Sequence, residues 1–215
     1  MLNESINKTS KPYVVNYGTY RVEEIIKSKF DDGLIHCVYA GTLDPKKGGC
    51  AASIAAAEFL PEGYHIHILG FGNDDYIKKT NDLIDEISLK TKCQITYDGL
   101  KSGKEYLSFL QSCHIGLSTQ NPDASFNATS FPSKVLSYLS NGLHVVTVDV
   151  PSISNSKVGA ILTYYKKQDP REIANAIRSI DINQKYNPRE FLSNLANEFE
   201  RELSILMRAI TGNVK

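Results

Sequence analysis

The sequence lacks an excess of charge of either sign, because 24 lysine and arginine residues balance 24 aspartate and glutamate residues in a chain of 215. A chain without a net field has no general attraction for nucleic acid or an anionic membrane, so an anionic ligand would need a local site. Long apolar runs are also missing: no stretch approaches the ~18 residues of a membrane span, and residues 1–10 lack the apolar core of a signal peptide. These absences predict a cytoplasmic protein that has no transmembrane segment and binds no nucleic acid.

Cysteine pairs at the spacing of zinc or redox motifs are missing as well. The four cysteines stand far apart, and none belongs to a Cys-x-x-Cys pair. They are Cys37, Cys50, Cys93 and Cys113. We therefore expect buried free thiols in a reducing compartment rather than disulfides or a zinc site.

The five histidines do not form a metal-binding pattern along the sequence. His65 and His67 point to one face of a predicted strand, which is a possible metal spacing, but no third ligand follows them. His36, His114 and His144 stand in or beside apolar runs and are expected to be packed, neutral core residues. The sequence therefore predicts no metal site.

What the sequence does contain is a regular alternation of apolar runs and helical patterns. The predicted strands cover residues 34–40, 64–69, 93–97, 114–118 and 144–148, and the predicted helices cover residues 20–30, 51–60, 75–90, 104–112, 133–140 and 170–180. Strands that alternate with helices through short turns imply right-handed βαβ units in one parallel sheet. The expected fold class is α/β, with a doubly wound, Rossmann-like parallel sheet.

On this pattern the chain divides into three segments. Residues 1–33 are a linker and entering segment, residues 34–186 form the ligand-binding domain, and residues 187–215 form a C-terminal amphipathic helix. The apolar stripe of this helix has the three- and four-residue spacing of one helix face. It consists of Phe191, Leu195, Phe199, Leu203, Leu206 and Ile210. We expect part of the stripe to pack on the chain's own sheet and part to be made for an absent domain.

The most suggestive loop, residues 40–49, follows the first predicted strand and opens a helix. Gly41 and Gly48 would let backbone amides approach an anion closely, and Lys46 and Lys47 add positive charge. This composition suits a diphosphate. The alternative is an exposed glycine-rich turn with solvated lysines.

Two further loops follow predicted strands. The loop 69–75 contains Gly72 in a Gly-x-Gly pattern, but it lacks the third glycine of the dinucleotide fingerprint. The turn 97–100 contains Asp98 and Gly99, where a planar base could lie against a strand end. An ordinary Asp-Gly turn is the competing interpretation.

The segment 127–146 carries the most information. Hydroxyl groups and an amide precede Pro132, which suits the first turn of a helix, and an Asn-Gly pair ends that helix. Its polar N-terminus would face the same sheet edge as the loop 40–49, so an anion could be held between two helix dipoles. The residues expected to face the ligand are Thr129, Ser130, Phe131, Pro132, Ser133, Lys134 and Ser137.

In order and spacing, this series of motifs resembles the C-terminal domain of retaining glycosyltransferases of the GT-B fold. The motifs are YAGTLDPKKGG, ILGFG, YDGL, a strand that ends in LST, and FPSKVLSYLSNGLHVVT, over about residues 34–180. The resemblance is to the group 1, family 4-like enzymes, which include those of bacterial polysaccharide biosynthesis. It implies that the domain binds a UDP- or GDP-linked sugar as substrate, with no cofactor and no metal. It also implies a missing N-terminal domain that binds a polysaccharide or glycolipid acceptor.

The resemblance assigns roles to the residues of the first loop. Gly41 matches the family's glycine at the strand end, and Lys47-Gly48 matches its Lys-Gly pair, whose lysine reaches the diphosphate. Thr42 stands where the family usually has arginine or lysine, so this phosphate contact is weakened or moves to Lys46. We therefore expect Lys47 and Lys46 to be the catalytic residues, which stabilise charge on the leaving diphosphate without a base in this half.

The sequence departs from the family at the Glu-x7-Glu pair, which falls on Thr129 and Ser137. The second glutamate normally binds the ribose hydroxyls, and a serine binds them less strongly than a charged group does. The expected activity is hexosyl transfer by a cytoplasmic enzyme, at the inner face of the cell membrane through its acceptor domain. The isolated half should not turn over, because it cannot align donor and acceptor. The alternatives are a non-catalytic nucleotide-sugar-binding or regulatory subunit and, from the Gly-x-Gly pattern alone, a nicotinamide-dependent oxidoreductase.

Overall fold

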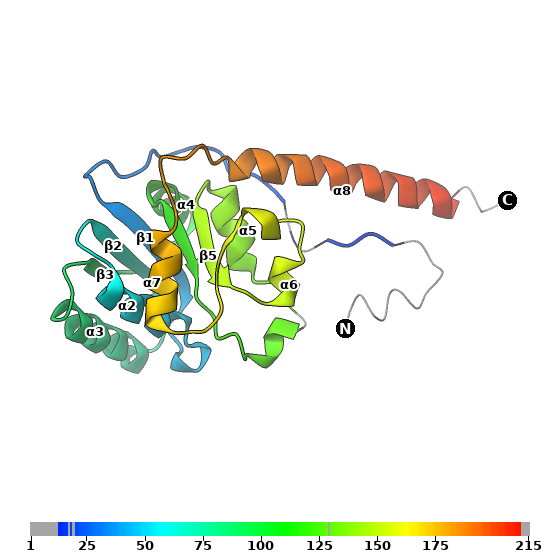
Figure 1. The fold of residues 1–215 in the computed structure, drawn as a ribbon. Helices are drawn as coiled ribbons and strands as arrows, with labels where there is room; N and C mark the ends of the chain where they lie inside the picture. The colour runs from blue at the N-terminus through cyan, green and yellow to red at the C-terminus, as the bar shows by residue number, and fades with distance from the viewer. Residues whose placement is uncertain (1–12, 17, 19, 129, 212–215) are drawn as a thin grey trace.

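A computed structural model of the protein describes residues 13–16, 18, 20–128 and 130–211 (Figure 1). Its centre is a six-stranded sheet in the order β3-β2-β1-β4-β5-β6. The strands are β1 Ile35–Thr42, β2 Tyr64–Phe71, β3 Gln94–Gly99, β4 Ile115–Ser118, β5 His144–Val148 and β6 Thr163–Tyr165. Every ladder of this sheet is parallel, which confirms the predicted doubly wound α/β fold.

Helices cover both faces of the sheet. The α-helices are α2 Gly49–Ala56, α3 Asp74–Ser88, α4 Gly103–Ser112, α5 Ser133–Ser140, α6 Pro151–Ser154, α7 Pro170–Arg178 and α8 Pro188–Thr211. The 3-10 helices are η1 Pro45–Lys47, η2 Ala57–Phe59, η3 Ser125–Ala128 and η4 Gly159–Ile161. Helices α2, α3 and α7 contribute to the apolar core on one face, and α4, α5 and α8 to the core on the other. No helix in the described part of the chain is both long and apolar enough to span a membrane.

The central strands are continuous apolar runs in the sequence, and strand β1 shows the reason. Cys37 and Tyr39 belong to one core cluster, and Val38 and Ala40 belong to the other, so successive side chains enter opposite faces. A parallel strand between two helical layers is buried on both faces and has no polar alternation. All four cysteines are free and buried, as the sequence predicts.

The predicted helix at residues 20–30 is wrong, because this segment has no regular secondary structure. Its backbone is held instead by Gln111 of α4. The Gln111 Oε1 accepts hydrogen bonds from the N–H groups of Ile26, at 2.9 Å, and Lys27, at 3.2 Å. The Gln111 amide also donates to the carbonyl of Glu24 at 2.7 Å. Tertiary partners therefore supply the hydrogen bonds that a helix would have made internally.

Helix α8 confirms that its apolar stripe is only partly covered by the chain itself. Its first half packs against α5, and Leu192 is fully buried there. Lys157 then pairs with two glutamates of α8, each at 2.9 Å. Beyond this point the helix projects away from the sheet (Figure 1), and Leu203 and Ile210 are 39% and 53% exposed.

Candidate functional site

The strand order reverses between β1 and β4, and this reversal positions the candidate site. In open parallel sheets, ligands bind in the crevice at the carboxyl ends of the strands where the order reverses. β1 and β4 are paired only through Cys37 with Ile115 and Val38 with Gly116, so they part before their carboxyl ends. Tyr138 of α5 lies where the strands part, and its hydroxyl accepts a hydrogen bond from the N–H of Ala40 at 2.9 Å.

A pocket of about 200 Å³ lies beyond these strand ends. Its walls come from the end of β1 and the following loop, the end of β4 and the N-terminus of α5. The lining residues are Tyr39, Thr42, Lys47, Gly49, Ser118, Thr119, Gln120, Pro132, Ser133 and Lys134. The structure thus joins the loop 40–49 to the start of α5, as the sequence predicts.

Lys134 is the central charged group of this pocket. Its ammonium lies 4.1 Å from the centre of the Tyr39 ring, a cation–π contact. A side chain at Gly41 would meet the same ammonium, so glycine there lets Lys134 keep its position over Tyr39. Burial lowers the pKa of Lys134 to about 8, and no carboxylate of the described residues offsets this effect. A buried ammonium without a carboxylate partner is stabilised by an anion that enters the pocket.

Two helix N-termini add to this positive field. Helix α5 begins after Pro132 without a side-chain cap; the N–H of Val135 is bonded to the carbonyl of Pro132 at 3.0 Å, and the N–H groups before it have no acceptor within the helix. Helix α2 begins at Gly49 after Gly48, also without a side-chain cap. Gly48 has φ +68°, a left-handed conformation that favours glycine. Both Gly49 and the start of α5 line the pocket, which suits an anion between two dipoles.

The two predicted catalytic lysines differ in position. Both are exposed and belong to η1, whose start is capped by Asp44 through a 2.9 Å hydrogen bond from the Lys46 N–H. Only Lys47 lines the pocket; Lys46 is not among the lining residues. The Thr42 hydroxyl, also in the lining, accepts the N–H of Asp44 at 3.1 Å and so helps to shape this turn.

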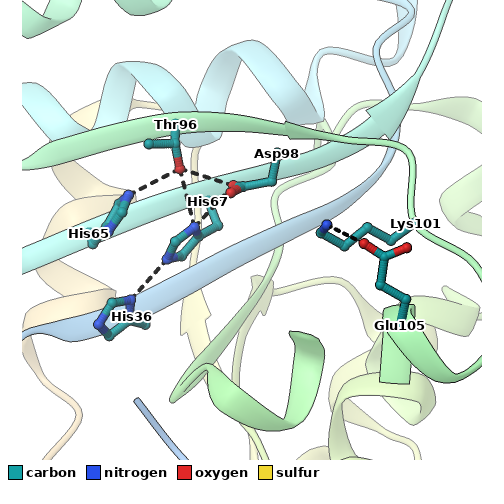
Figure 2. A network of polar contacts seen from close by, with 7 residues as sticks. All are labelled: His36, His65, His67, Thr96, Asp98, Lys101 and Glu105. Atoms are coloured by element: carbon teal, nitrogen blue, oxygen red, sulfur yellow. Dashed lines mark hydrogen bonds and ion pairs between the residues drawn. The ribbon is translucent and has the colours of Figure 1, made fainter. Parts of the chain in front are cut away.

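The predicted site residues that follow β2 or end β3 lie outside the pocket lining. A side chain at Gly72 would meet Tyr76 at 2.9 Å, which gives this glycine a packing role. Asp98 is turned toward His67, whose Nδ1 lies 3.0 Å from the carboxylate (Figure 2). Gly99 has φ +74° at the strand end. A nucleotide contact by these residues stays a prediction.

The remaining predicted residues belong to the segment before α5 and to α5 itself. Ser130 is exposed, and Phe131 is half-buried against both core clusters. Ser137, one turn after Lys134, is hydrogen-bonded to the hydroxyl of Tyr106. Thr129 lies outside the described residues.

Sequence reasoning missed the contribution of β4. The Thr119 hydroxyl donates to the carbonyl of Gly49 at 2.6 Å and lies 2.7 Å from the hydroxyl of Ser53, which ties the end of β4 to α2. The carbonyl of Gln120 accepts a hydrogen bond from Tyr165 at 2.7 Å. Thr119 and Gln120 follow a predicted strand, as the loop 40–49 does, so their position at a strand end was the signal that could have identified them.

Comparison with known proteins adds the fold of related structures. No protein-family model matches the sequence, and no curated protein is detectably similar to it. The solved structures that are similar in fold include the following three. A glycosyltransferase from Rickettsia africae matches with 14% identity and a TM-score of 0.61 over 85% of this chain and 49% of that one. HepE of Anabaena, in complex with UDP, matches with 16% identity and a TM-score of 0.60 over 84% and 48%.

The third is the catalytic domain of a cholesterol-α-glucosyltransferase from Helicobacter pylori, with 14% identity and a TM-score of 0.50 over 83% of this chain and 99% of that one. The chain thus spans about half the length of the first two proteins. Together with the strand order and the pocket at its reversal, these matches define a doubly wound α/β domain. More particularly, the chain has the fold of one Rossmann-like half of a GT-B glycosyltransferase.

Proposed function

We propose that this chain is the donor-binding half of a glycosyltransferase, and that its pocket holds the diphosphate of a UDP- or GDP-linked sugar. The observation that carries the proposal is Lys134, a half-buried ammonium in the pocket wall without a carboxylate partner among the described residues. It stands beside two uncapped helix N-termini, and together these groups form a concentrated positive field. The UDP complex of the similar protein HepE supports a nucleoside diphosphate as ligand.

The charged groups suggest how this half would contribute to transfer. Negative charge grows on the departing nucleoside diphosphate as the glycosidic bond breaks, and positioned donors stabilise it. Lys134 and the first-turn amides of α5 would bind the diphosphate from one side of the pocket. Lys47, at the end of η1, would approach from the other side. Lys46, which does not line the pocket, is expected to contribute less.

The acceptor would be bound by a second domain that faces this one. We propose a polysaccharide or glycolipid acceptor and a hexosyl donor, with the reaction at the inner face of the cell membrane. This half alone would bind the donor without turnover, because holding both reactants in line supplies several powers of ten in rate. The exposed outer part of α8 is proposed to contact the facing domain.

The second candidate function is non-catalytic binding of a nucleotide sugar. The pocket lining contains no carboxylate, and Ser137 is hydrogen-bonded to Tyr106. Both observations favour weaker recognition of the ribose than a glutamate would give. An assay of sugar transfer by the chain together with its facing domain separates the two functions, because a regulatory subunit would bind the donor and transfer nothing.

Calorimetry with UDP, GDP and the matching monophosphates tests the proposed ligand. We expect a nucleoside diphosphate to bind more tightly than its monophosphate, because the positive charges of the pocket would also bind the second phosphate. Lys47→Ala should weaken binding by about tenfold or more, the worth of a charged hydrogen bond. Lys46→Ala, the neighbouring exposed lysine, is the matched control and should change affinity by less than about twofold. Unchanged affinity in Lys47→Ala, or no binding of any diphosphate, would reject the site.

A further inference from the structure

A cluster of three histidines lies in the sheet, away from the pocket. His36 of β1 is paired in register with His65 of β2, and His67 follows two residues later on the same face. Each offers one ring nitrogen, and the three nitrogens lie within 4.8 Å of one another. The sequence shows no third ligand beside His65 and His67 because it is supplied by the neighbouring strand (Figure 2).

The inner ring nitrogens of His36 and His67 face each other at hydrogen-bond distance. The Nε2 of His36 lies 2.8 Å from a carboxylate oxygen of Asp32, and the Nδ1 of His67 lies 3.0 Å from one of Asp98. An ionised carboxylate only accepts hydrogen bonds, so each outer ring nitrogen carries the N–H. The inner nitrogens, His36 Nδ1 and His67 Nε2, are 2.9 Å apart. A proton shared by these two nitrogens satisfies both when no metal is bound, and a metal ion that displaces the proton would be bound by the same lone pairs.

The third imidazole is oriented in the same manner. The Thr96 hydroxyl donates to Asp98 at 2.9 Å, so it accepts a hydrogen bond from the Nε2 of His65, which lies 3.0 Å away. The rings of His65 and His67 are 3.8 Å apart between centroids. Three nitrogens bound to one tetrahedral zinc at 2.0–2.1 Å stand about 3.3 Å from one another. Side-chain rotations that open the 2.9 Å pair slightly and shorten the other separations, which are at most 4.8 Å, by about 1.5 Å or less would therefore fit this cluster around an ion.

The surroundings have the features of an outer metal shell. Ligating histidines commonly donate their second N–H to a carboxylate, which fixes the ring and raises its basicity. Asp98 reaches His67 from a strand whose register with β2 shifts between Ile68 and Leu69, and such bulges re-aim side chains. Phe30 stacks on His67 at 5.7 Å between centroids, and Phe109 meets the same ring edge-on at 5.1 Å. Half-buried His65 leaves one side of the cluster open to solvent.

We propose that His36, His65 and His67 bind a zinc ion that ties β1 to β2, with Asp32 and Asp98 orienting the ligands. Imidazole is a preferred zinc ligand, and three histidines with an open fourth position form a complete zinc set. Thr42 at the pocket lies six positions after His36, which is about 20 Å along a strand. The proposed metal site is therefore separate from the proposed nucleotide site, and a negative binding result for one leaves the other proposal unaffected.

Titration of Zn²⁺ alone into the full chain, freed of any polyhistidine tag and of metal, tests the proposal. We expect one zinc per chain by calorimetry and a rise in Tm on binding. Co²⁺ in its place should give the intense visible absorption of a tetrahedral site. His67→Ala should weaken zinc binding more than 100-fold, and Asp98→Asn should weaken it about 10- to 100-fold, the usual effect of losing an outer-shell partner.

Two further variants keep the result interpretable. His65→Ala changes a half-exposed side chain and is expected to fold even if the buried His67 variant does not. His144→Ala removes a histidine that stacks on Tyr186 outside the cluster, and it should bind zinc as the native chain does. Absence of saturable zinc binding, or equal affinity in His65→Ala and the native chain, would overturn the proposal. A proton would then bridge His36 and His67.

Discussion

Replacing Lys134 by methionine is expected to stabilise the fold and weaken nucleotide binding at the same time. Burial lowers the pKa of this ammonium from 10.5 to about 8. At about 1.36 kcal/mol per pKa unit, the charged form costs the folded state roughly 3 kcal/mol. Because the folded pKa lies below the unfolded one, this cost is present in full below pH 8 and disappears as the pH rises through 10.5.

Methionine keeps a flexible apolar side chain over the Tyr39 ring and removes the charge. The free energy of unfolding of Lys134→Met should therefore rise by up to about 3 kcal/mol at pH 7, and by less than half of that at pH 9.5. Urea denaturation followed by circular dichroism at both pH values measures the change. The variant also loses a charged hydrogen bond to the diphosphate, worth ~1.5–3 kcal/mol, so calorimetry should show affinity for UDP or GDP reduced about 10- to 150-fold.

Lys101→Met is the matched control. The Lys101 ammonium lies 5.2 Å from the Phe109 ring, but it pairs with Glu105 at 2.7 Å and does not line the pocket. This variant should change stability by less than about 1 kcal/mol and leave nucleotide affinity unchanged. A folded Lys134→Met protein that is less stable than the native chain at pH 7, or that binds the diphosphate as tightly, would contradict the roles given to Lys134.

Three further outcomes follow from the structure. Gly41→Ala should lower nucleotide affinity at least about tenfold in calorimetry, because its methyl group displaces the Lys134 ammonium, and equal affinity would contradict this role. Gln111→Ala should lower the free energy of unfolding in urea by about 2 kcal/mol or more, because the backbone groups of Glu24 and Ile26 lose their hydrogen-bond partner. An unchanged free energy of unfolding would show that Gln111 does not hold this segment. In α8, Leu192→Ala should cost about 2–5 kcal/mol in the same assay, whereas Ile205→Ser should cost less than about 0.5 kcal/mol; similar costs would mean that the outer half is packed.

The predictable part of the fold is the part that local periodicity determines. Helix α5 and strand β5 match the predicted bounds. Each has a clear apolar pattern, and Pro132 and the Asn-Gly pair mark where the helix begins and ends. The segment 20–30 has helix-compatible residues, but its conformation is decided by Gln111, a residue some 85 positions away. Strand β6 is three residues at a sheet edge, too short to show any periodicity.

The candidate site was predictable to a similar degree. The rule that ligands gather at strand ends selected the loop 40–49 and the start of α5, and both line one pocket. The rule could not rank the lysines within them. Lys134 differs from Lys46 in its burial over Tyr39, which depends on how α5 packs beside β1. In the same way, the proposed histidine set is split between two strands and has no spacing signature, so His36 could not be assigned to it from the sequence.

Hydrogen exchange of the backbone amides in the projecting end of α8 would show whether a partner is bound there. Residues 203–211 extend about 14 Å at ~1.5 Å per residue, and an isolated helix of this length is marginal in water. Backbone amides there should exchange with deuterium rapidly, while those around the buried Leu192 stay protected. Any partner that covers Leu203 and Ile210 would slow this exchange. Mass spectrometry of the C-terminal peptides would then detect the contact without a label, a substrate or turnover.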